Sequence, residues 1–169
     1  AQLRVVGAME WVMGAQRLER QTVHTACVKV TAPGTGALAT DALLATQCDA
    51  HAGFGGTTAF LALWREGAAD AKLADWTCDR RELFDGRGQR ALADHFGAQA
   101  GLGLDPCAAA STMLLVPPAA QQQCVFVVGH GETRIAASDL AARCFEQPAV
   151  DRERAVQAHW QRLLGAVTV

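Results

Sequence analysis

The chain has 169 residues, of which 50% are hydrophobic and 19% are charged, and its formal net charge at neutral pH is −2. This composition excludes a disordered chain, and the length is enough to bury one core without metals or disulfides. The charge provides no basic surface for nucleic acid or anionic lipid, and no apolar run reaches the length of a membrane span. We therefore expect no nucleic-acid partner and no direct membrane contact.

The first 131 residues are mostly short apolar runs separated by Gly, Pro and Asp, which is typical of an all-β domain. Strands are expected at residues 3–13, 22–30, 42–48, 57–64, 108–116 and 122–128. Period-two alternation in the second of these predicts that one set of side chains faces the core, namely His24, Ala26, Val28 and Val30. Residues 57–64 are apolar on both faces, which indicates a covered central strand and therefore two stacked sheets. The Ala-rich residues 91–100 fit either a short helix or a loop.

After Gly131 the apolar side chains recur with the period of an α-helix. The first stripe consists of Ala137, Leu140, Ala141, Cys144 and Phe145. A second helix is predicted from Pro148 and Asp151 onward, and its stripe consists of Val156, Trp160, Leu163, Leu164 and Val167. We therefore divide the chain into a β-sandwich segment, residues 1–131, and a helical linker, residues 132–169. Little of this chain remains for the second stripe to pack against.

Gly129-His130-Gly131 lies between a predicted strand and a predicted helix, where a dinucleotide-binding fingerprint would begin. The third glycine position holds Arg134, and no later strand completes a βαβ unit. We interpret these residues as a tight turn into the helix.

The six cysteines lie 17 to 30 residues apart without a C-x-x-C pair, and the five histidines have no i, i+4 spacing. These spacings do not match a zinc site, so we expect no metal and no cofactor. We interpret the cysteines as mostly reduced, buried thiols of a cytosolic protein.

Residues 76–87 (WTCDRRELFDGR) place three carboxylates and three arginines beside Trp76. From the sequence we expect the side chain of Trp76 to be exposed. Nearby guanidinium groups favour ionised carboxylates, which is the wrong state for the general acid of a glycosidase. We interpret the cluster as structural, with acids and arginines that mainly hold each other; its members are Asp79, Arg80, Arg81 and Glu82. The candidates for carbohydrate contact are Trp76, as a sugar platform, and Arg80, Arg81 and Arg87. No catalytic residue is assigned.

Three short segments occur in order along the chain: EWVMG at residues 10–14, Trp76-Thr77 followed by DRRE at residues 79–82, and GLDPCAA at residues 103–109. They resemble the E-W-V-L-G, W-T-x-D-R-R-E-F and G-L-D-P-C-A-A segments of the large β-sandwich, or supersandwich, domain of cyclic β-1,2-glucan synthases and of cellobiose and chitobiose phosphorylases. Residues 125–129, the helix after them and residues 160–165 are similar to the passage from that sandwich towards a helical catalytic barrel. The chain departs from the family at Asp85, which looks like an insertion, and at Ala119, where the family has a P-G-E turn.

The resemblance implies a mainly β fold, an antiparallel β-sandwich of the galactose-mutarotase-like supersandwich type with two C-terminal helices. It covers the second half of the family's sandwich and the linker, so the implied partners are the other half, the catalytic barrel of a parent enzyme and a β-glucan. The chain alone is expected to be non-catalytic, and the parent to be of the glycosyltransferase or glycoside phosphorylase type. The family also implies a soluble part, on the cytoplasmic side, of an inner-membrane-associated bacterial protein.

Sheet edges and an apolar helix without a partner predict a homo-oligomer.

Two other functions stay open from the sequence. A self-standing carbohydrate-binding module needs aromatic rings on one face, and the chain has four Trp and no Tyr. A small hydrolase needs a Cys beside a His, and such partners are neighbours in space rather than in sequence.

Overall fold

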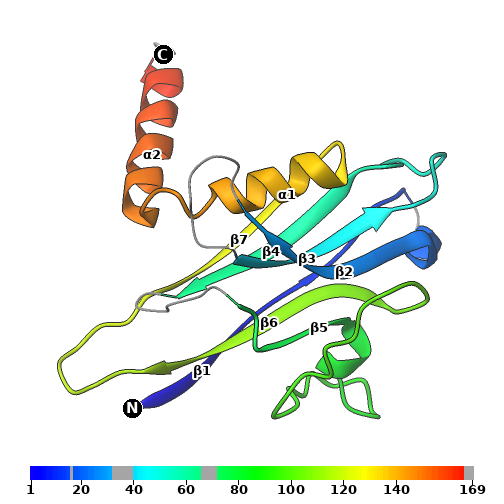
Figure 1. Ribbon diagram of the computed structural model, residues 1–169, viewed down its shortest axis with the longest axis horizontal. Helices are drawn as coiled ribbons and strands as arrows, with labels where there is room; N and C mark the ends of the chain where they lie inside the picture. Colours follow the sequence, from blue (N-terminus) through cyan, green and yellow to red (C-terminus); the bar gives the residue numbers. More distant parts are fainter. Residues whose placement is uncertain (16, 32–39, 66–71, 166–169) are drawn as a thin grey trace.

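Two antiparallel β-sheets stack face to face, and a helix covers the outer face of one of them (Figure 1). The computed structural model describes residues 1–15, 17–31, 40–65 and 72–165. The three-stranded sheet has the order β1-β6-β5, with β1 Gln2–Glu10, β6 Pro106–Leu115 and β5 Asp75–Asp79. The four-stranded sheet has the order β2-β3-β4-β7, with β2 Val23–Val30, β3 Thr40–Gln47, β4 Thr58–Arg65 and β7 Cys124–Gly131. The expected antiparallel β-sandwich is thereby confirmed.

The main core lies between the two sheets. Val23, Leu43 and Leu61 enter it from the four-stranded sheet, and Cys78 and Ala108 enter it from the three-stranded sheet. Each of these side chains is at most 2% exposed. Burying one large aliphatic side chain contributes about 1.5 to 3 kcal/mol, so this shared cluster holds the sheets together.

Strand β4 is covered on both faces, as its apolar sequence predicts. Leu61 belongs to the main core, whereas Phe60 belongs to a second cluster with Ala137 and Ala141 of the helix above the sheet. Residues 58–63 are all buried in consequence. The molecule therefore has three layers, namely helix, four-stranded sheet and three-stranded sheet.

The side chains that the sequence assigned to the core face of β2 do not lie on the face between the two sheets. Val23 and Thr25 are 2% and 1% exposed and lie on the side of the main core, together with Cys27. Val28 and Val30 instead pack in the second cluster, beneath the helix. Both faces of this sheet are covered, so the alternation of apolar residues alone does not identify the face between the sheets.

Strand β5 was not predicted, because its sequence DWTCD begins and ends with a residue type that is depleted in strands. Among the described strands its partner is β6, and its register shifts between Thr77 and Asp79. The 3-10 helix η2 Arg80–Leu83 follows at once, and another, η1 Arg17–Thr22, precedes β2. Residues 91–100, which fitted either a helix or a loop, form a loop.

Helix α1 Arg134–Arg143 follows β7 through the tight turn expected at Gly131. Thr133 caps it by accepting a hydrogen bond from the backbone N–H of Ala136 at 3.1 Å. A Cβ atom at Gly131 would lie 2.5 Å from the backbone nitrogen of Ala137, so glycine lets the helix approach the strand closely. The small side chain of Ala141 then buries completely against the sheet.

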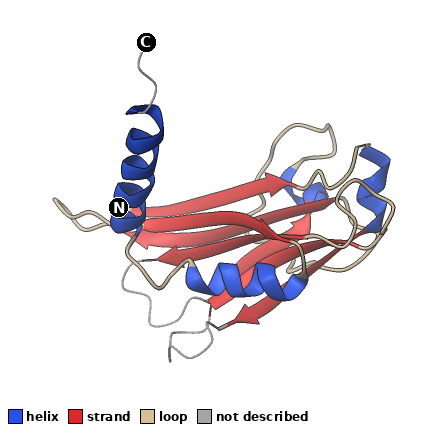
Figure 2. Cartoon of the chain, turned by 90° about the horizontal axis from the view of Figure 1, so that it is seen from above, coloured by secondary structure: helices blue, strands red, loops and turns tan. Residues whose placement is uncertain are grey.

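Helix α2 Ala149–Gly165 projects away from the sandwich (Figure 2). The apolar side chains of its predicted stripe are 47 to 65% exposed, namely Val156, Trp160, Leu163 and Leu164. Val167, the last expected member, lies outside the described residues. The division of the chain after residue 131 stays a prediction. No helix in the described part of the chain is long and apolar enough to cross a bilayer.

Candidate functional site

The three sequence segments that carry the family resemblance meet at one end of the sandwich. Strand pairing places Glu10 opposite Cys107 and Asp79 opposite Pro106. Two further backbone bonds join the segments, from Trp11 N–H to Pro106 C=O at 3.3 Å and from Arg80 N–H to Asp105 C=O at 2.8 Å. We name this place the motif junction and define it by Glu10, Trp11, Asp79, Arg80 and Asp105.

Arg80 is the centre of an ion-pair chain at the motif junction. Its Nε lies 2.7 Å from Oε1 of Glu10, and its Nη1 lies 3.4 Å from Oδ2 of Asp105. Arg20 reaches the other oxygen of Asp105, with Nη1 at 3.0 Å from Oδ1. The guanidinium of Arg80 also stacks on Phe84, 4.3 Å from the ring centroid. The end of β1 and the residue before β6 are thus joined through one cation.

Asp79 is 5% exposed and caps η2 by accepting a hydrogen bond from the backbone N–H of Arg81 at 3.0 Å. The side chain of Arg81 adds a second contact, from Nε to Oδ1 at 2.9 Å. Burial raises the pKa of Asp79, but the hydrogen bonds and charge of Arg81 outweigh it, so the pKa lies below its ordinary value. This direction agrees with the expectation that the arginines hold the carboxylates ionised.

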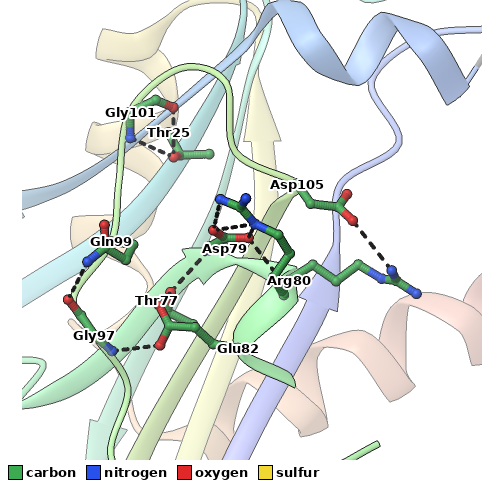
Figure 3. A network of polar contacts seen from close by, with 10 residues as sticks. Thr25, Thr77, Asp79, Arg80, Glu82, Gly97, Gln99, Gly101 and Asp105 are labelled. Atoms are coloured by element: carbon green, nitrogen blue, oxygen red, sulfur yellow. Dashed lines mark hydrogen bonds and ion pairs between the residues drawn. The ribbon is translucent and has the colours of Figure 1, made fainter. Parts of the chain in front are cut away.

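Glu82 fastens the loop at residues 97–101 to the end of the sandwich (Figure 3). Its carboxylate accepts hydrogen bonds from the hydroxyl of Thr77 at 2.8 Å and from the backbone N–H of Gly97 at 2.6 Å. Further along the loop, Gly101 N–H donates to the hydroxyl of Thr25 at 3.1 Å, and Thr25 N–H donates to Gly101 C=O at 3.0 Å. The loop therefore connects β5 of one sheet to β2 of the other.

The predicted carbohydrate contacts are spread over different environments. Trp76 is half-buried rather than exposed, because it packs against the main core. Arg80 is engaged in the ion-pair chain, whereas Arg81 and Arg87 are exposed. Asp85 forms a turn by accepting hydrogen bonds from the N–H groups of two later residues at 2.9 Å each. The roles assigned to these residues stay predictions.

The charged cluster at residues 79–82 includes ion pairs with residues outside it, which its sequence did not indicate. Within it, only Asp79 and Arg81 form an ion pair. Arg80 pairs instead with Glu10 and Asp105, which sequence reasoning did not assign to any site. The signal was present, because Glu10 and Asp105 each belong to one of the three segments that carry the family resemblance, but nothing in a linear sequence shows that these segments meet.

The cysteines give no support to a nucleophilic site. All six are free, but only Cys78 and Cys107 are buried and Cys48 is exposed, so the expectation of mostly buried thiols was wrong. Burial raises the pKa of Cys27 to about 11 and that of Cys78 to about 12, which leaves both thiols protonated at neutral pH. Among the described residues, no group of three or more His, Cys, Asp or Glu side chains is placed to hold a metal ion.

Two cavities flank opposite ends of β1. The one at the motif junction has a volume of about 320 Å³ and is lined by Glu10, Trp11, Val12, Met13, Ala15, Arg20, Asp105 and Pro106. The other has a volume of about 570 Å³ and includes Arg4, Asp75 and Ser111 in its lining. Arg4 and Asp75 form an ion pair there at 2.8 Å. Of the residues that define the motif junction, Glu10, Trp11 and Asp105 line the smaller of these two cavities.

The comparison with protein families agrees with this geometry. The family described as glycosyl hydrolase 94, supersandwich domain, matches residues 1–147, a span that contains every strand named above and α1. No curated protein matches the chain. The suspected resemblance is thus confirmed at the level of the domain family. With its sandwich fold and its family match in agreement, the chain belongs to the glycosyl hydrolase 94 supersandwich domains.

Proposed function

We propose that this chain acts as the non-catalytic β-sandwich segment of a carbohydrate-active enzyme of the cyclic β-1,2-glucan synthase type. In that role it supports the handling of a glucan and packs against the catalytic barrel of its parent. Membership of the supersandwich family is the observation that carries this proposal. The parent would be a glycosyltransferase or a glycoside phosphorylase.

The acidic side chains at the motif junction have contacts that do not suit glycosidic catalysis. Cleavage of a glycosidic bond needs one carboxyl group that holds a proton and a second that acts as base or nucleophile. The carboxylates of Glu10, Asp79 and Asp105 each lie beside a guanidinium group. At Asp79 the hydrogen bonds and charge of Arg81 outweigh the effect of burial and lower the pKa, which opposes proton donation by this carboxyl group.

Incubation of the pure chain with β-1,2-glucan, with and without inorganic phosphate, tests the proposal. We expect release of neither glucose nor glucose 1-phosphate. Steady release that is lost in Asp79→Asn or Glu82→Gln, but retained in the exposed control Asp85→Asn, would show that the chain is itself an enzyme.

The chain is further proposed to self-associate through α2. The exposed side chains of Val156, Trp160 and Leu164 form an apolar face on a helix that buries little of itself against the sandwich. A symmetric contact hides the same face on both chains, which makes a homodimer the simplest assembly.

A further inference from the structure

Trp11 carries a hydrogen-bond donor that the fold does not satisfy. The residue is 7% exposed, and its indole Nε1–H has no acceptor among the described residues. Buried donors in native proteins are nearly always paired, because an unpaired one costs roughly 1 to 3 kcal/mol. An orphaned donor on a residue that lines a cavity points to an acceptor that the described residues do not supply.

The cavity beside Trp11 has a size that limits what enters it. Its volume of about 320 Å³ is near the lower end of ligand sites, which begins at roughly 300 Å³. The lining combines the charged groups of Glu10, Arg20 and Asp105 with apolar surface from Met13 and Pro106. Such a cavity has room for one ring with polar substituents.

The charges at this cavity are balanced. Arg20 pairs with Asp105, and Arg80 bridges Asp105 and Glu10, so two guanidinium groups face two carboxylates. A further anion or cation would have to compete with a partner already in place. A neutral ligand that both donates and accepts hydrogen bonds avoids this competition.

We infer that this cavity binds a single neutral pyranose unit, such as the terminal unit of a glucan. A carboxylate has about four acceptor sites, so Asp105 keeps sites for sugar hydroxyl groups beyond the contacts with Arg20 and Arg80. Hydroxyl oxygens in turn accept from Arg20 and from the indole N–H of Trp11. The C–H face of the ring meets Met13 and Pro106. This inference rests on the proposed role in glucan handling and names the unit that is bound and its place.

Titration of the full chain with D-glucose tests the inference, with the four indole N–H resonances of the protein as the readout. The resonance that disappears in Trp11→Phe is assigned to Trp11. We expect this resonance to shift and the shift to saturate with a Kd of roughly 1 to 10 mM, because a ligand with few atoms can gain only a small binding free energy. The resonance of Trp160, which lies on α2, is expected not to move.

A matched pair of cavity-filling variants locates the site. Ala15 is exposed and lines the smaller cavity, so Ala15→Trp is expected to weaken glucose binding about tenfold or more without touching a charged group. Ala74 is exposed and lines the larger cavity, so Ala74→Trp is expected to leave the Kd unchanged. Circular dichroism establishes that both variants are folded. Inorganic phosphate is expected not to displace glucose.

The inference is wrong if the Trp11 resonance shows no saturable shift up to roughly 100 mM glucose. It is also wrong if folded Ala15→Trp has an unchanged Kd, if Ala74→Trp loses binding, or if phosphate displaces glucose. The proposed function fails separately, through release of glucose or glucose 1-phosphate from glucan, which is measured without any binding experiment.

Discussion

The motif junction and helix α2 reverse the usual distribution of residues between core and surface. At the junction the charged residue Asp79 is 5% exposed, whereas on α2 the apolar residue Trp160 is 54% exposed. Asp79 is buried because a backbone N–H and a guanidinium satisfy its oxygens. Trp160 belongs to α2, which projects away from the sandwich.

The comparison teaches that partners, rather than polarity alone, decide what is buried in this molecule. A carboxylate without its hydrogen-bond donors would be costly at the position of Asp79, and an apolar side chain without a neighbour gains nothing from its position on α2. Substitutions in the two regions should therefore have opposite consequences for folding and for association.

The largest expected effect is that of Asp79→Ala. Loss of the cap of η2 and of the acceptors for Arg81 is expected to lower the free energy of unfolding by about 2 kcal/mol and the Tm by roughly 4 to 8 °C. Thermal denaturation measures this effect. Asp79→Asn, which keeps an acceptor for the backbone N–H, should recover part of the loss, and Arg81→Ala on the exposed side of the pair should cost less. Unchanged melting with loss of glucan binding would make the pair of Asp79 and Arg81 a ligand contact instead of a structural one.

The next effect is expected from Thr25→Val, which removes a buried hydroxyl without changing a charge. Thr25 is 1% exposed, and its hydroxyl contacts both N–H and C=O of Gly101 at 3.1 Å. We expect a loss of about 1 to 1.5 kcal/mol in the free energy of unfolding, measured in urea. Thr25→Ser keeps the hydroxyl and should lose less of the stability. A larger loss in Thr25→Ser than in Thr25→Val would mean that the methyl group matters more than the hydroxyl that bridges the sheets.

Acid is expected to lower the free energy of unfolding, because it protonates carboxylates that form hydrogen bonds and ion pairs in the folded chain. The pKa values of Asp79 and Asp75 lie below the ordinary value of 3.8, so both carboxylates stabilise the fold above that pH. The contribution is lost as the pH falls below about 4 and through the lower native pKa values. Urea denaturation at stepped pH should show this fall, and Asp79→Asn should make it shallower. A fall of equal steepness in that variant would contradict the assignment to Asp79.

The smallest effect on folding is expected on α2. Replacement of Trp160 and Leu164 by Ser is expected to change the free energy of unfolding of the sandwich by less than about 0.5 kcal/mol, since both side chains are exposed. The same change should weaken self-association in sedimentation equilibrium. A monomer at high concentration before the substitution would contradict the proposed homodimer, and a large loss of stability would mean that α2 is packed in solution.

Much of the fold follows from local sequence. The apolar run of β4 predicted a central covered strand, and the period change after Gly131 predicted α1 and α2. Strand β5 was missed because its Asp residues and Trp76 carry no alternation that distinguishes a strand from a turn. The interior face of β2 was misassigned because both of its faces are covered by different layers.

The sequence by itself determined the family and the chemistry of each segment, since both depend on residue types at short spacing. Only the tertiary structure decided that Glu10, Arg80 and Asp105 form one ion-pair chain. It also buries Trp11 beside that chain, with an N–H that finds no acceptor in the described part of the protein. These residues lie up to 95 positions apart, from Glu10 to Asp105. Antiparallel pairing of β1 and β5 with β6 brings them together, and such long-range pairing has no local signature because it depends on how two separate strands align with a third.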